Sequence, residues 1–560
     1  MLTLIIGIDM GGTHIDGVVL KDYKLIKIVK KPIDTKDRFL SIWQCLEDLL
    51  FDLPIKEIKR INLSTTISTN AIVEDKLEKV AMVLESGPGL DSSFLACGQE
   101  NFFISGYIDH RGHEVEGLDT KELKAIGKDL EEKGHKYYGI VGKFSTRNPQ
   151  HEEEIQKLLN HTNVKYMSLG HRMSGNLNYP RRVWTSYLNS AVYKSFKDFA
   201  DSIEKAIKSK NIKAPIYILK ADGGTMDLKS AKNLPVESIL SGPAASFMGI
   251  KAHFEEEDED CLYIDIGGTT TDIFFLADGQ PLFQPQGIDI GDYKTQIRAL
   301  YSKSIGLGGD SVVQVKDNKL KIGPQRLGPA YAFNGPSPTP TDAMIYLGLM
   351  EGNMDRASEA MKKIGQEVDL TPKEVSIRIL EDMAKSIKDT VDQALDHINS
   401  QPVYTVKEVL EDKKVIPKKI YMIGGPAKVM APYLEEAFSL KCHYPKTYAV
   451  ANAIGAGLSQ VTKELNLLAD SAQGFLQIPE MGIRKNISSR FNLEEAKKIA
   501  LESLKEVAKD MGVDEDLDYQ IIEANSFNMV RGFYTTGKNI RVKAQIMPKL
   551  ISRLEDDFSD

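Results

Sequence analysis

Apolar runs of strand length alternate along the chain with longer stretches in which apolar residues recur at helical spacing. The runs at residues 4–8 and 262–264 are almost unbroken, which is typical of strands that are buried on both faces. The alternation of such strands with helices predicts an α/β protein. Helices are predicted over residues 120–133, 151–160, 183–209, 355–398, 450–468 and 492–511.

The two apolar runs lead into the same acid-and-glycine pattern. Residues 9–16 read Asp-Met-Gly-Gly-Thr-His-Ile-Asp, and residues 265–272 read Asp-Ile-Gly-Gly-Thr-Thr-Thr-Asp, at a constant offset of 256 residues. A second apolar strand follows each copy, at residues 17–20 and 273–276. We therefore expect two strand–turn–strand hairpins, one in each of two homologous lobes that face each other.

Composition narrows the classes of function. The 560 residues carry 71 Lys and Arg against 79 Asp and Glu, a net charge of −8, which argues against a partner nucleic acid. Four scattered cysteines without a Cys-x-x-Cys pair exclude a disulfide framework and a zinc signature. The apolar start meets Asp9 too soon for a signal peptide, and no apolar run approaches the ~20 residues that cross a bilayer. We expect a soluble, cytoplasmic protein with no membrane partner.

The distribution of these signals predicts a domain plan. Residues 1–210 form the first lobe, with 80–170 inserted as an α/β subdomain that carries its own strand and helix signals. Residues 211–469 form the second lobe, with a mostly helical insertion over 286–410. Residues 470–560 are left as a C-terminal appendix whose role the sequence does not indicate.

The two hairpins have the chemistry that a polyphosphate requires. Glycines allow backbone N–H groups to approach a phosphate closely, and threonine hydroxyls add donors. Asp9 and Asp265, each at the end of a buried strand, are predicted to hold Mg²⁺ largely through its waters, because Mg²⁺ dehydrates reluctantly. Asp272 is predicted to polarise an attacking group or to order a metal-bound water, and these three acids are the catalytic candidates. The predicted phosphate-binding residues are Gly11, Gly12, Thr13, Gly267, Gly268, Thr269 and Thr270.

A single turn of this kind is most simply a tight hairpin. Two copies at a constant offset, with a further strand–Gly-Gly–helix turn at residues 420–427, instead favour a nucleotide-binding site. The pattern is neither Gly-x-x-x-x-Gly-Lys-Ser/Thr nor Gly-x-Gly-x-x-Gly, so P-loop and Rossmann folds are excluded.

These features resemble the actin, sugar-kinase and Hsp70 superfamily. The likeness includes both hairpins, an adenosine motif at Gly424, Gly425 and Pro426, and a helix turn at 451–457. It implies a two-lobed actin-like ATPase fold of duplicated ribonuclease-H-like domains with inserted subdomains. Within the superfamily, the chain resembles the hydantoinase A/5-oxoprolinase family. The stretches that carry this narrower resemblance are 64–74, 144–151, 221–226, 241–246, 265–272 and 340–342.

The family resemblance implies a reaction and its partners. It implies ATP and Mg²⁺ as cofactors and the ATP-dependent opening of a cyclic amide of the hydantoin, 5-oxoproline or lactam type. Phosphorylation of the amide oxygen removes the resonance that protects an unstrained amide, and it supplies a leaving group for attack by water. Family members often work with a separate hydantoinase B-type subunit, so such a partner is expected beside the small substrate. Whether the chain forms a homo-oligomer is left open.

The chain departs from the family pattern in and near the hairpins. His14 replaces an apolar residue, and we expect it to be packed or hydrogen-bonded rather than to act as a base. Gly308 and Gly309 are expected beside the phosphates, but Asp310 follows them where the family usually has glycine. Asp310 either joins the metal shell, weakens ATP binding or has a structural role in its loop, and we favour the structural role.

A third departure lies in residues 170–182, which carry Arg172, Arg181 and Arg182. They form either a pocket for an anionic substrate, because guanidinium groups suit carboxylates, or a surface loop and helix start. Two further functions are open on the same scaffold, because a fold does not fix a function. One is an ATP-driven reactivating chaperone, and the other is a small-molecule kinase that releases a stable phosphorylated product. The sequence identifies neither the substrate nor a base for the final attack by water.

Overall fold

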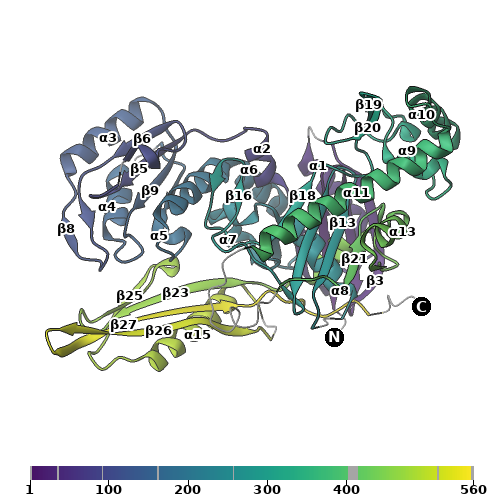
Figure 1. Ribbon diagram of the computed structural model, residues 1–560. Coiled ribbons are helices and arrows are strands. Elements are labelled where there is room, and N and C mark those ends of the chain that lie inside the picture. The colour runs from purple at the N-terminus through teal and green to yellow at the C-terminus, as the bar shows by residue number, and fades with distance from the viewer. Residues whose placement is uncertain are drawn as a thin grey trace.

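The first lobe is built on a six-stranded mixed sheet (Figure 1). The structure, a computed structural model, describes residues 3–34, 37–90, 92–160, 163–255, 258–400, 414–513 and 516–555. The strands of this sheet are β1 (Leu4–Met10), β2 (His14–Lys21), β3 (Lys24–Pro32), β4 (Ile58–Ser64), β11 (Ile216–Leu219) and β12 (Thr225–Asp227). Its helices are α1 (Arg38–Leu50), α2 (Ile67–Val73), α6 (Tyr179–Ser209) and α7 (Leu228–Asn233). The sheet order is β12–β11–β4–β1–β2–β3, and β1, β4 and β11 run parallel.

A four-stranded parallel sheet forms a subdomain within the first lobe. Its order is β10–β9–β5–β6, with a small antiparallel pair beside it. The strands are β5 (Val80–Glu85), β6 (Glu100–Phe103), β7 (Tyr107–Ile108), β8 (Glu114–Glu116), β9 (Tyr137–Gly142) and β10 (Tyr166–Leu169). The helices are α3 (Thr120–Glu132), α4 (Gln150–Leu159) and α5 (Gly170–Met173). Parallel strands require crossover connections, which the helices supply.

The second lobe repeats the hairpin and parallel-strand arrangement of the first. Its sheet order is β15–β14–β13–β21–β22, and β18 also pairs with β14. The strands of this sheet are β13 (Cys261–Ile266), β14 (Thr271–Ala277), β15 (Gln280–Pro281), β18 (Ser302–Ile305), β21 (Lys419–Ile423) and β22 (Lys441–His443). Two short strand pairs lie outside the sheet: β16 (Asp289–Ile290) with β17 (Tyr293–Lys294), and β19 (Val313–Lys316) with β20 (Lys319–Ile322). The helices are α8 (Ser241–His253), α9 (Pro340–Tyr346), α10 (Met354–Glu367), α11 (Pro372–Asn399), α13 (Ala427–Phe438) and α14 (Ala451–Leu458).

The long helix predicted over 355–398 is two helices, α10 and α11. Thr371 caps α11 through a reciprocal arrangement with Glu374, and a proline follows at the first helical position. A side chain at Gly365 would bring its Cβ within 2.5 Å of the Leu370 carbonyl oxygen, so the chain turns tightly here. Capping and proline signals therefore override a periodicity that continues through the break.

The two lobes meet where helices α8 and α14 pack against each other and against β1. The contact is backbone to backbone. A Cβ at Gly455 would lie 2.1 Å from the Gly249 nitrogen, and a Cβ at Gly7 would lie 2.1 Å from the Ala453 carbonyl oxygen. Real side chains do not approach backbone so closely, so only glycine permits this packing.

The helix predicted over 450–468 is wrong in its second half. Helix α14 ends at Leu458, and β23 (Lys463–Asp470) begins four residues after Ser459. β23 pairs with β27 (Tyr534–Ile546), which lies at the other end of the sequence. Tertiary pairing with this distant strand overrides the local helical pattern.

The C-terminal region is an antiparallel sheet with one long helix packed on it. The order is β25–β24–β23–β27–β26. The elements beyond β23 are β24 (Phe475–Ile478), β25 (Ile483–Asn486), α15 (Leu493–Asp510), β26 (Tyr519–Arg531) and β27. In Figure 1 this sheet lies below the inserted subdomain, with the β26–β27 hairpin projecting to the left.

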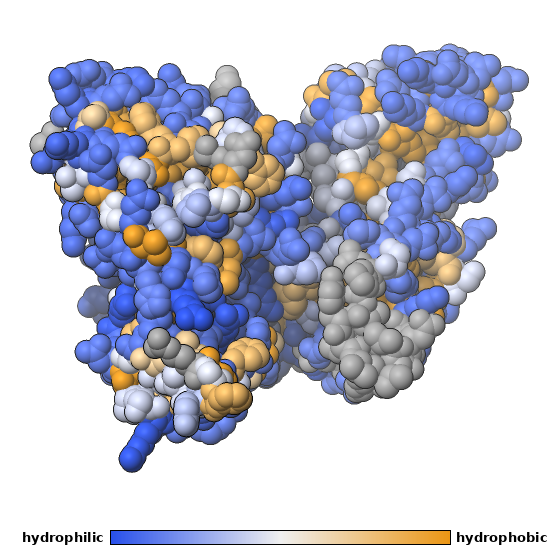
Figure 2. All heavy atoms as spheres, turned by 60° about the vertical axis from the view of Figure 1, so that its left-hand side comes forward, coloured by the Kyte–Doolittle hydropathy of each residue, from blue (hydrophilic) through white to orange (hydrophobic). Residues whose placement is uncertain are grey.

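The space-filling view shows two arms separated by a wide notch (Figure 2). Hydrophilic residues cover most of this face, and apolar patches are scattered among them. Among the described helices, none is long and apolar enough to cross a membrane.

Candidate functional site

Both predicted hairpins are present, and their registers correspond residue for residue. Asp9 pairs with Asp16 across β1 and β2, and Asp265 pairs with Asp272 across β13 and β14. The turns also share one hydrogen bond: Gly11 N donates to His14 O at 3.0 Å, and Gly267 N donates to Thr270 O at 2.9 Å. The sequence repeat therefore reflects a structural repeat.

The tips of the two hairpins face each other between the lobes. A Cβ at Gly12 would lie 3.7 Å from Thr269 Oγ1, and a Cβ at Gly268 would lie 3.8 Å from Thr13 Oγ1. These four residues are exposed or half-buried, and among the described residues their N–H groups have no backbone acceptor. The N–H groups of Gly11 and Gly267 are used in the hydrogen bonds of their own turns. The N–H groups without a backbone acceptor among the described residues are therefore those of the next two residues in each hairpin.

Buried carboxyl groups lie beneath the tips. Asp9 is 4% exposed, and its Oδ1 has no hydrogen-bond partner among the described residues. Burial raises the pKa of Asp9 to about 7, and the charges of Asp16 and Asp265 add to the rise. Burial likewise raises the pKa of Asp272 to about 7, and its Oδ1 also lacks a partner among the described residues. Burial thus disfavours the charged form of both carboxyl groups, and a nearby cation would favour it again.

Asp265 is held more firmly than Asp9. Ser246 Oγ donates to Asp265 Oδ2 at 2.6 Å, and Asn452 Nδ2 donates to the same oxygen at 3.0 Å. Burial still raises the pKa of Asp265. Ser246 lies on α8 and Asn452 on α14, so the two helices that join the lobes also orient this carboxyl group.

A loop of the second lobe packs on its own hairpin. Gly309 N donates to Gly267 O at 3.0 Å, and Asp310 N donates to Gly268 O at 2.7 Å. A Cβ at Gly308 would lie 2.6 Å from Gly267 O, so the loop fits only without a side chain there. Asp310 Oδ2 lies 3.4 Å from Arg326 Nη2 and 3.0 Å from the Cβ position of Gly268 at the hairpin tip.

The Gly424–Gly425–Pro426 turn passes directly over Asp265. Gly424 has a φ of +93°, and its Cβ would lie 2.4 Å from Asp265 Oδ1. Pro426 contacts the preceding loop, with its Cγ 3.3 Å from the Cβ position of Gly309. At Gly425 no heavy atom lies within 4 Å of the Cβ position, which leaves open space beside the turn.

The donor set fits a magnesium-bound nucleotide. Within the described ranges, no group of three or more His, Cys, Asp or Glu side chains is placed to hold a metal ion. Mg²⁺ does not need such a cage, because it keeps most of its waters and binds through one or two carboxylates and the phosphates of its ligand. Asp9 with its unpartnered oxygen and Asp265 with its raised pKa suit that role, and the free N–H groups of the tips suit phosphates.

The other candidates from the sequence have varied surroundings. His14 is exposed, and its Nδ1 lies 2.9 Å from Thr13 Oγ1. Arg182 is fully buried and donates to three backbone carbonyl oxygens. Arg181 donates to the Thr295 carbonyl oxygen at 2.7 Å, so both arginines join segments of the chain. Arg172 lines a pocket away from the hairpins.

Sequence reasoning missed the residues that orient the carboxyl groups. Lys30 Nζ lies 2.9 Å from Asp16 Oδ1. Asp16 occupies the position in the first hairpin that Asp272 occupies in the second. Ser246 lies in a segment that the family resemblance marked and Asn452 in one that the superfamily resemblance marked, but only tertiary packing brings them to Asp265. The constant offset of the sequence repeat did identify Asp16, because Asp16 is the counterpart of Asp272 in the first hairpin.

Two lobes whose matched hairpins face each other define an α/β protein of the two-lobed actin-like ATPase fold. The family model described as "Hydantoinase/oxoprolinase" matches residues 182–465 of this chain. The model described as "Hydantoinase/oxoprolinase N-terminal region" matches residues 5–162. The chain belongs to the hydantoinase/oxoprolinase family.

A curated relative is similar to this chain, and two solved structures share its fold. The caprolactamase subunit alpha of Pseudomonas jessenii is 23% identical over 494 residues, which cover 81% of this chain and 70% of that protein. A crystal structure of ATP-dependent caprolactamase from the same organism has a TM-score of 0.70 at 18% identity, covering 99% of this chain and 88% of that one. Nucleotide-free acetone carboxylase also has a TM-score of 0.70, at 15% identity, covering 98% and 88%. These structural similarities establish the fold.

Proposed function

We propose that the chain is an ATP-dependent hydrolase that opens a cyclic amide of the hydantoin, 5-oxoproline or lactam type, or the ATP-binding subunit of such an enzyme. The observation that carries this proposal is the approach of the hairpin tips, Gly12 to Thr269 and Gly268 to Thr13, above buried carboxyl groups. Family membership and the caprolactamase relative support the type of substrate.

In this proposal the two lobes bind one nucleotide from opposite sides. The N–H groups of Gly12 and Gly268 and the hydroxyls of Thr13 and Thr269 bind phosphate oxygens. Asp9 and Asp265 are the residues that would hold Mg²⁺. Bound Mg·ATP supplies the phosphoryl group that turns the amide oxygen into a leaving group. Positioning and charge stabilisation are most of what phosphoryl transfer requires of a protein.

Asp272 would act on the attacking group. Its Oδ1 has no hydrogen-bond partner among the described residues, and burial raises its pKa to about 7. A general base is most efficient when its pKa lies near the pH of the reaction. The Asp265 charge contributes to that rise. We therefore assign to Asp272 the orientation of the attacking group or of a water on the metal.

Release of ADP and phosphate, measured with 5-oxoproline, hydantoin and caprolactam, tests the proposed reaction. A ring-opened product is expected with one of these amides. A stable phosphorylated small molecule would replace the proposal by a kinase, and turnover stimulated only by another protein would replace it by a chaperone. Asp9→Ala and Asp265→Ala are expected to abolish ATP hydrolysis while the circular dichroism spectrum stays unchanged. Wild-type turnover in either variant would contradict the site assignment.

We also propose that the chain works with a second, B-type subunit. The supporting observation is that the caprolactamase relative is itself named as a subunit. The same assay, run with and without a candidate B-type subunit, is expected to give ring-opened product only when both chains are present. Full activity of the chain alone would refute this part of the proposal.

A further inference from the structure

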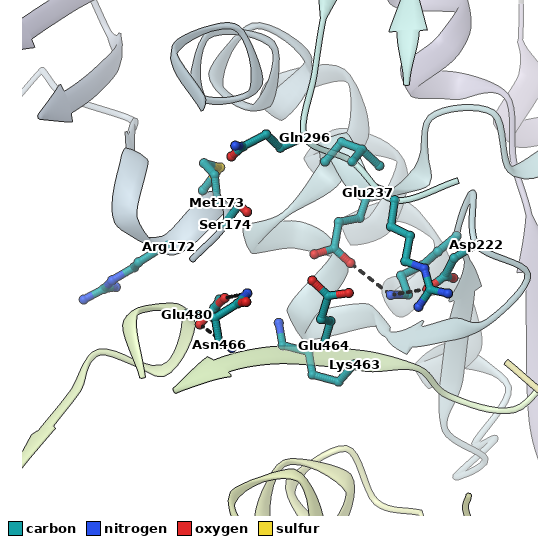
Figure 3. Close-up of a pocket in the computed structure, with 13 residues that line it drawn as sticks. Arg172, Met173, Ser174, Asp222, Glu237, Gln296, Lys463, Glu464, Asn466 and Glu480 are labelled. Atoms are coloured by element: carbon teal, nitrogen blue, oxygen red, sulfur yellow. Dashed lines mark hydrogen bonds and ion pairs between the residues drawn. The ribbon is translucent and has the colours of Figure 1, made fainter. Parts of the chain in front are cut away.

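Two pockets lie side by side where the C-terminal sheet meets the first lobe and its inserted subdomain. In the first pocket, drawn in Figure 3, four basic and four acidic side chains balance, and Lys220 Nζ lies 3.4 Å from Asp222 Oδ2 and 3.2 Å from Glu237 Oε2. Asn466 lines both pockets, and its Nδ2 donates to Glu480 Oε1 at 2.6 Å (Figure 3). The second pocket is a hollow of about 630 Å³, part of it open to solvent, and its charges do not balance.

The second hollow, which we call the arginine pocket, has an excess of positive charge. Its charged lining residues are Arg147, Arg541, Lys543 and Glu523. Lys543 Nζ lies 2.9 Å from Glu464 Oε1, so this charge is paired. Glu523 is exposed, and its Oε1 accepts a hydrogen bond from Asn525 Nδ2 at 2.7 Å. Neither Arg147 nor Arg541 forms an ion pair with any residue that the structure describes.

Arg147 is both buried and unsatisfied. The residue is 8% exposed, and its Nε has no hydrogen-bond partner among the described residues. Burial lowers the pKa of Arg147 to about 10, and the nearby charge of Arg541 adds to the lowering. Arg182, which is also buried, donates to three backbone carbonyl oxygens. The Arg147 guanidinium has no such set of acceptors in the described part of the chain, and a bound anion would offset the cost of burying its charge.

The loop that carries Arg147 is anchored on both sides of this residue. Gln477 on β24 donates from Nε2 to the Thr146 carbonyl oxygen. Arg484 on β25 donates from Nη1 to Asn148 Oδ1 at 2.9 Å. The residues before and after Arg147 are therefore tied to the C-terminal sheet, and they hold the guanidinium at the pocket although it makes no polar contact of its own with the described residues.

The arginine pocket also lies at the carboxyl edge of the parallel sheet of the subdomain. The sheet order is β10–β9–β5–β6, so the chain leaves β5 toward one edge and β9 toward the other. The switch point of the sheet thus lies between β5 and β9, and the loop after β9 carries Arg147. Residues 175–177, which also line the pocket, follow β10 and α5. In open α/β sheets, ligands bind outside the carboxyl ends of the strands at such a switch point.

We propose that the arginine pocket binds a small oxyanion, a carboxylate or a phosphate, between Arg147 and Arg541. The planar guanidinium group matches both kinds of oxyanion through paired hydrogen bonds. The anion relieves the repulsion between the two arginines. Because Arg147 belongs to the subdomain and Arg541 to β27, it also joins the subdomain to the C-terminal sheet. None of the lining residues belongs to the two hairpins, so this site is independent of the proposed function.

Titration calorimetry with the full chain tests this, with inorganic phosphate and acetate as probes and Mg·AMPPNP present to fill any phosphate site at the hairpins. The wild type is expected to bind at least one probe. Arg147→Met and Arg541→Met are each expected to weaken this binding about tenfold to a hundredfold, the value of one charge-assisted hydrogen bond. Arg490→Met is the matched control, because it removes the same charge at an exposed position outside the pocket, and it is expected to change nothing. Without anion, Arg147→Met is expected to melt no lower than the wild type, because it removes an unpaired buried charge.

The outcomes decide both the site and the kind of oxyanion. A loss confined to phosphate, or confined to acetate, supports the site and identifies the group that it accepts. Wild-type affinity in both Arg147→Met and Arg541→Met, an equal loss in Arg490→Met, or no binding of either probe to the wild type at millimolar concentrations would overturn the proposal. If Arg147→Met melts lower without anion while Arg541→Met keeps wild-type affinity, Arg147 has a structural role instead. Arg541 is exposed, so its variant decides the question even if Arg147→Met does not fold.

Discussion

The backbone contact between helices α8 and α14 predicts a large effect from a small substitution. In Gly455→Ala, the new Cβ would lie 2.1 Å from the Gly249 nitrogen and 2.5 Å from the Met248 carbonyl carbon. Both atoms belong to backbone inside a helix, so neither can rotate away. The first contact is about 1.3 Å shorter than the 3.4 Å at which ordinary contact begins, so the two helices must separate.

The expected magnitude follows from two opposing terms. Overpacking against an immovable neighbour costs about 3 kcal/mol, at the upper end of the usual range. Alanine inside a helix regains about 1 kcal/mol relative to glycine. We therefore expect Gly455→Ala to lower the free energy of unfolding by about 2 kcal/mol.

Urea unfolding followed by far-ultraviolet circular dichroism measures this change. Gly242→Ala is the matched control, because it lies in α8 and no heavy atom is within 4 Å of its Cβ position. It is expected to leave stability unchanged or to raise it slightly. A Gly455→Ala protein as stable as the wild type, or a Gly242→Ala protein equally destabilised, would refute the packing argument.

Three further predictions concern other parts of the chain. Arg182→Met removes the donor to three backbone carbonyl oxygens, and urea titration is expected to show a loss of about 3 kcal/mol; a loss under about 1 kcal/mol would contradict it. Glu152 is buried, which would raise its pKa, but its hydrogen bond and ion pair with His171 lower it below the ordinary value of 4.5. Glu152 therefore stabilises the fold at pH values above 4.5, and this stabilisation is lost as the pH falls through the lowered pKa. Glu152→Gln should therefore flatten the unfolding free energy against pH below about 4.5, and an unchanged acid profile would disprove the coupling. Phe533→Ser, at a fully exposed tip, should stay within about 0.5 kcal/mol of the wild type in the same titration, and a larger loss would show that the tip packs against something.

The hairpins could be predicted because every feature they need is local. Paired glycines, an acid on each strand and strong apolar runs specify the turn without any distant residue, and repetition at a fixed offset reveals the pairing of the lobes. Helices with clear caps could also be predicted from the sequence. Asp119 caps α3, which spans Thr120–Glu132, and the predicted helix covered residues 120–133. In such segments local propensity and tertiary structure agree.

The rest depended on contacts between distant parts of the chain. Residues after Leu458 leave the helical pattern because β27, some eighty residues later, offers a strand to pair with. Asn452 and Ser246 reach Asp265 only when α8 and α14 have packed together. No periodicity or spacing in the sequence encodes that proximity, so orienting residues are harder to find than the acids that they orient.

In the proposed nucleotide site each lobe supplies half of the phosphate contacts, so the measured nucleotide affinity would include the free energy of bringing the lobes together. A protein whose binding-competent arrangement is only partly populated shows a dissociation constant raised by the inverse of that fraction. The close contact of α14 in the second lobe with Gly7 on β1 in the first lobe lies between the lobes and touches no proposed ligand group. A substitution at this contact is expected to weaken apparent nucleotide affinity by the factor by which it depopulates the arrangement of the lobes that binds the nucleotide.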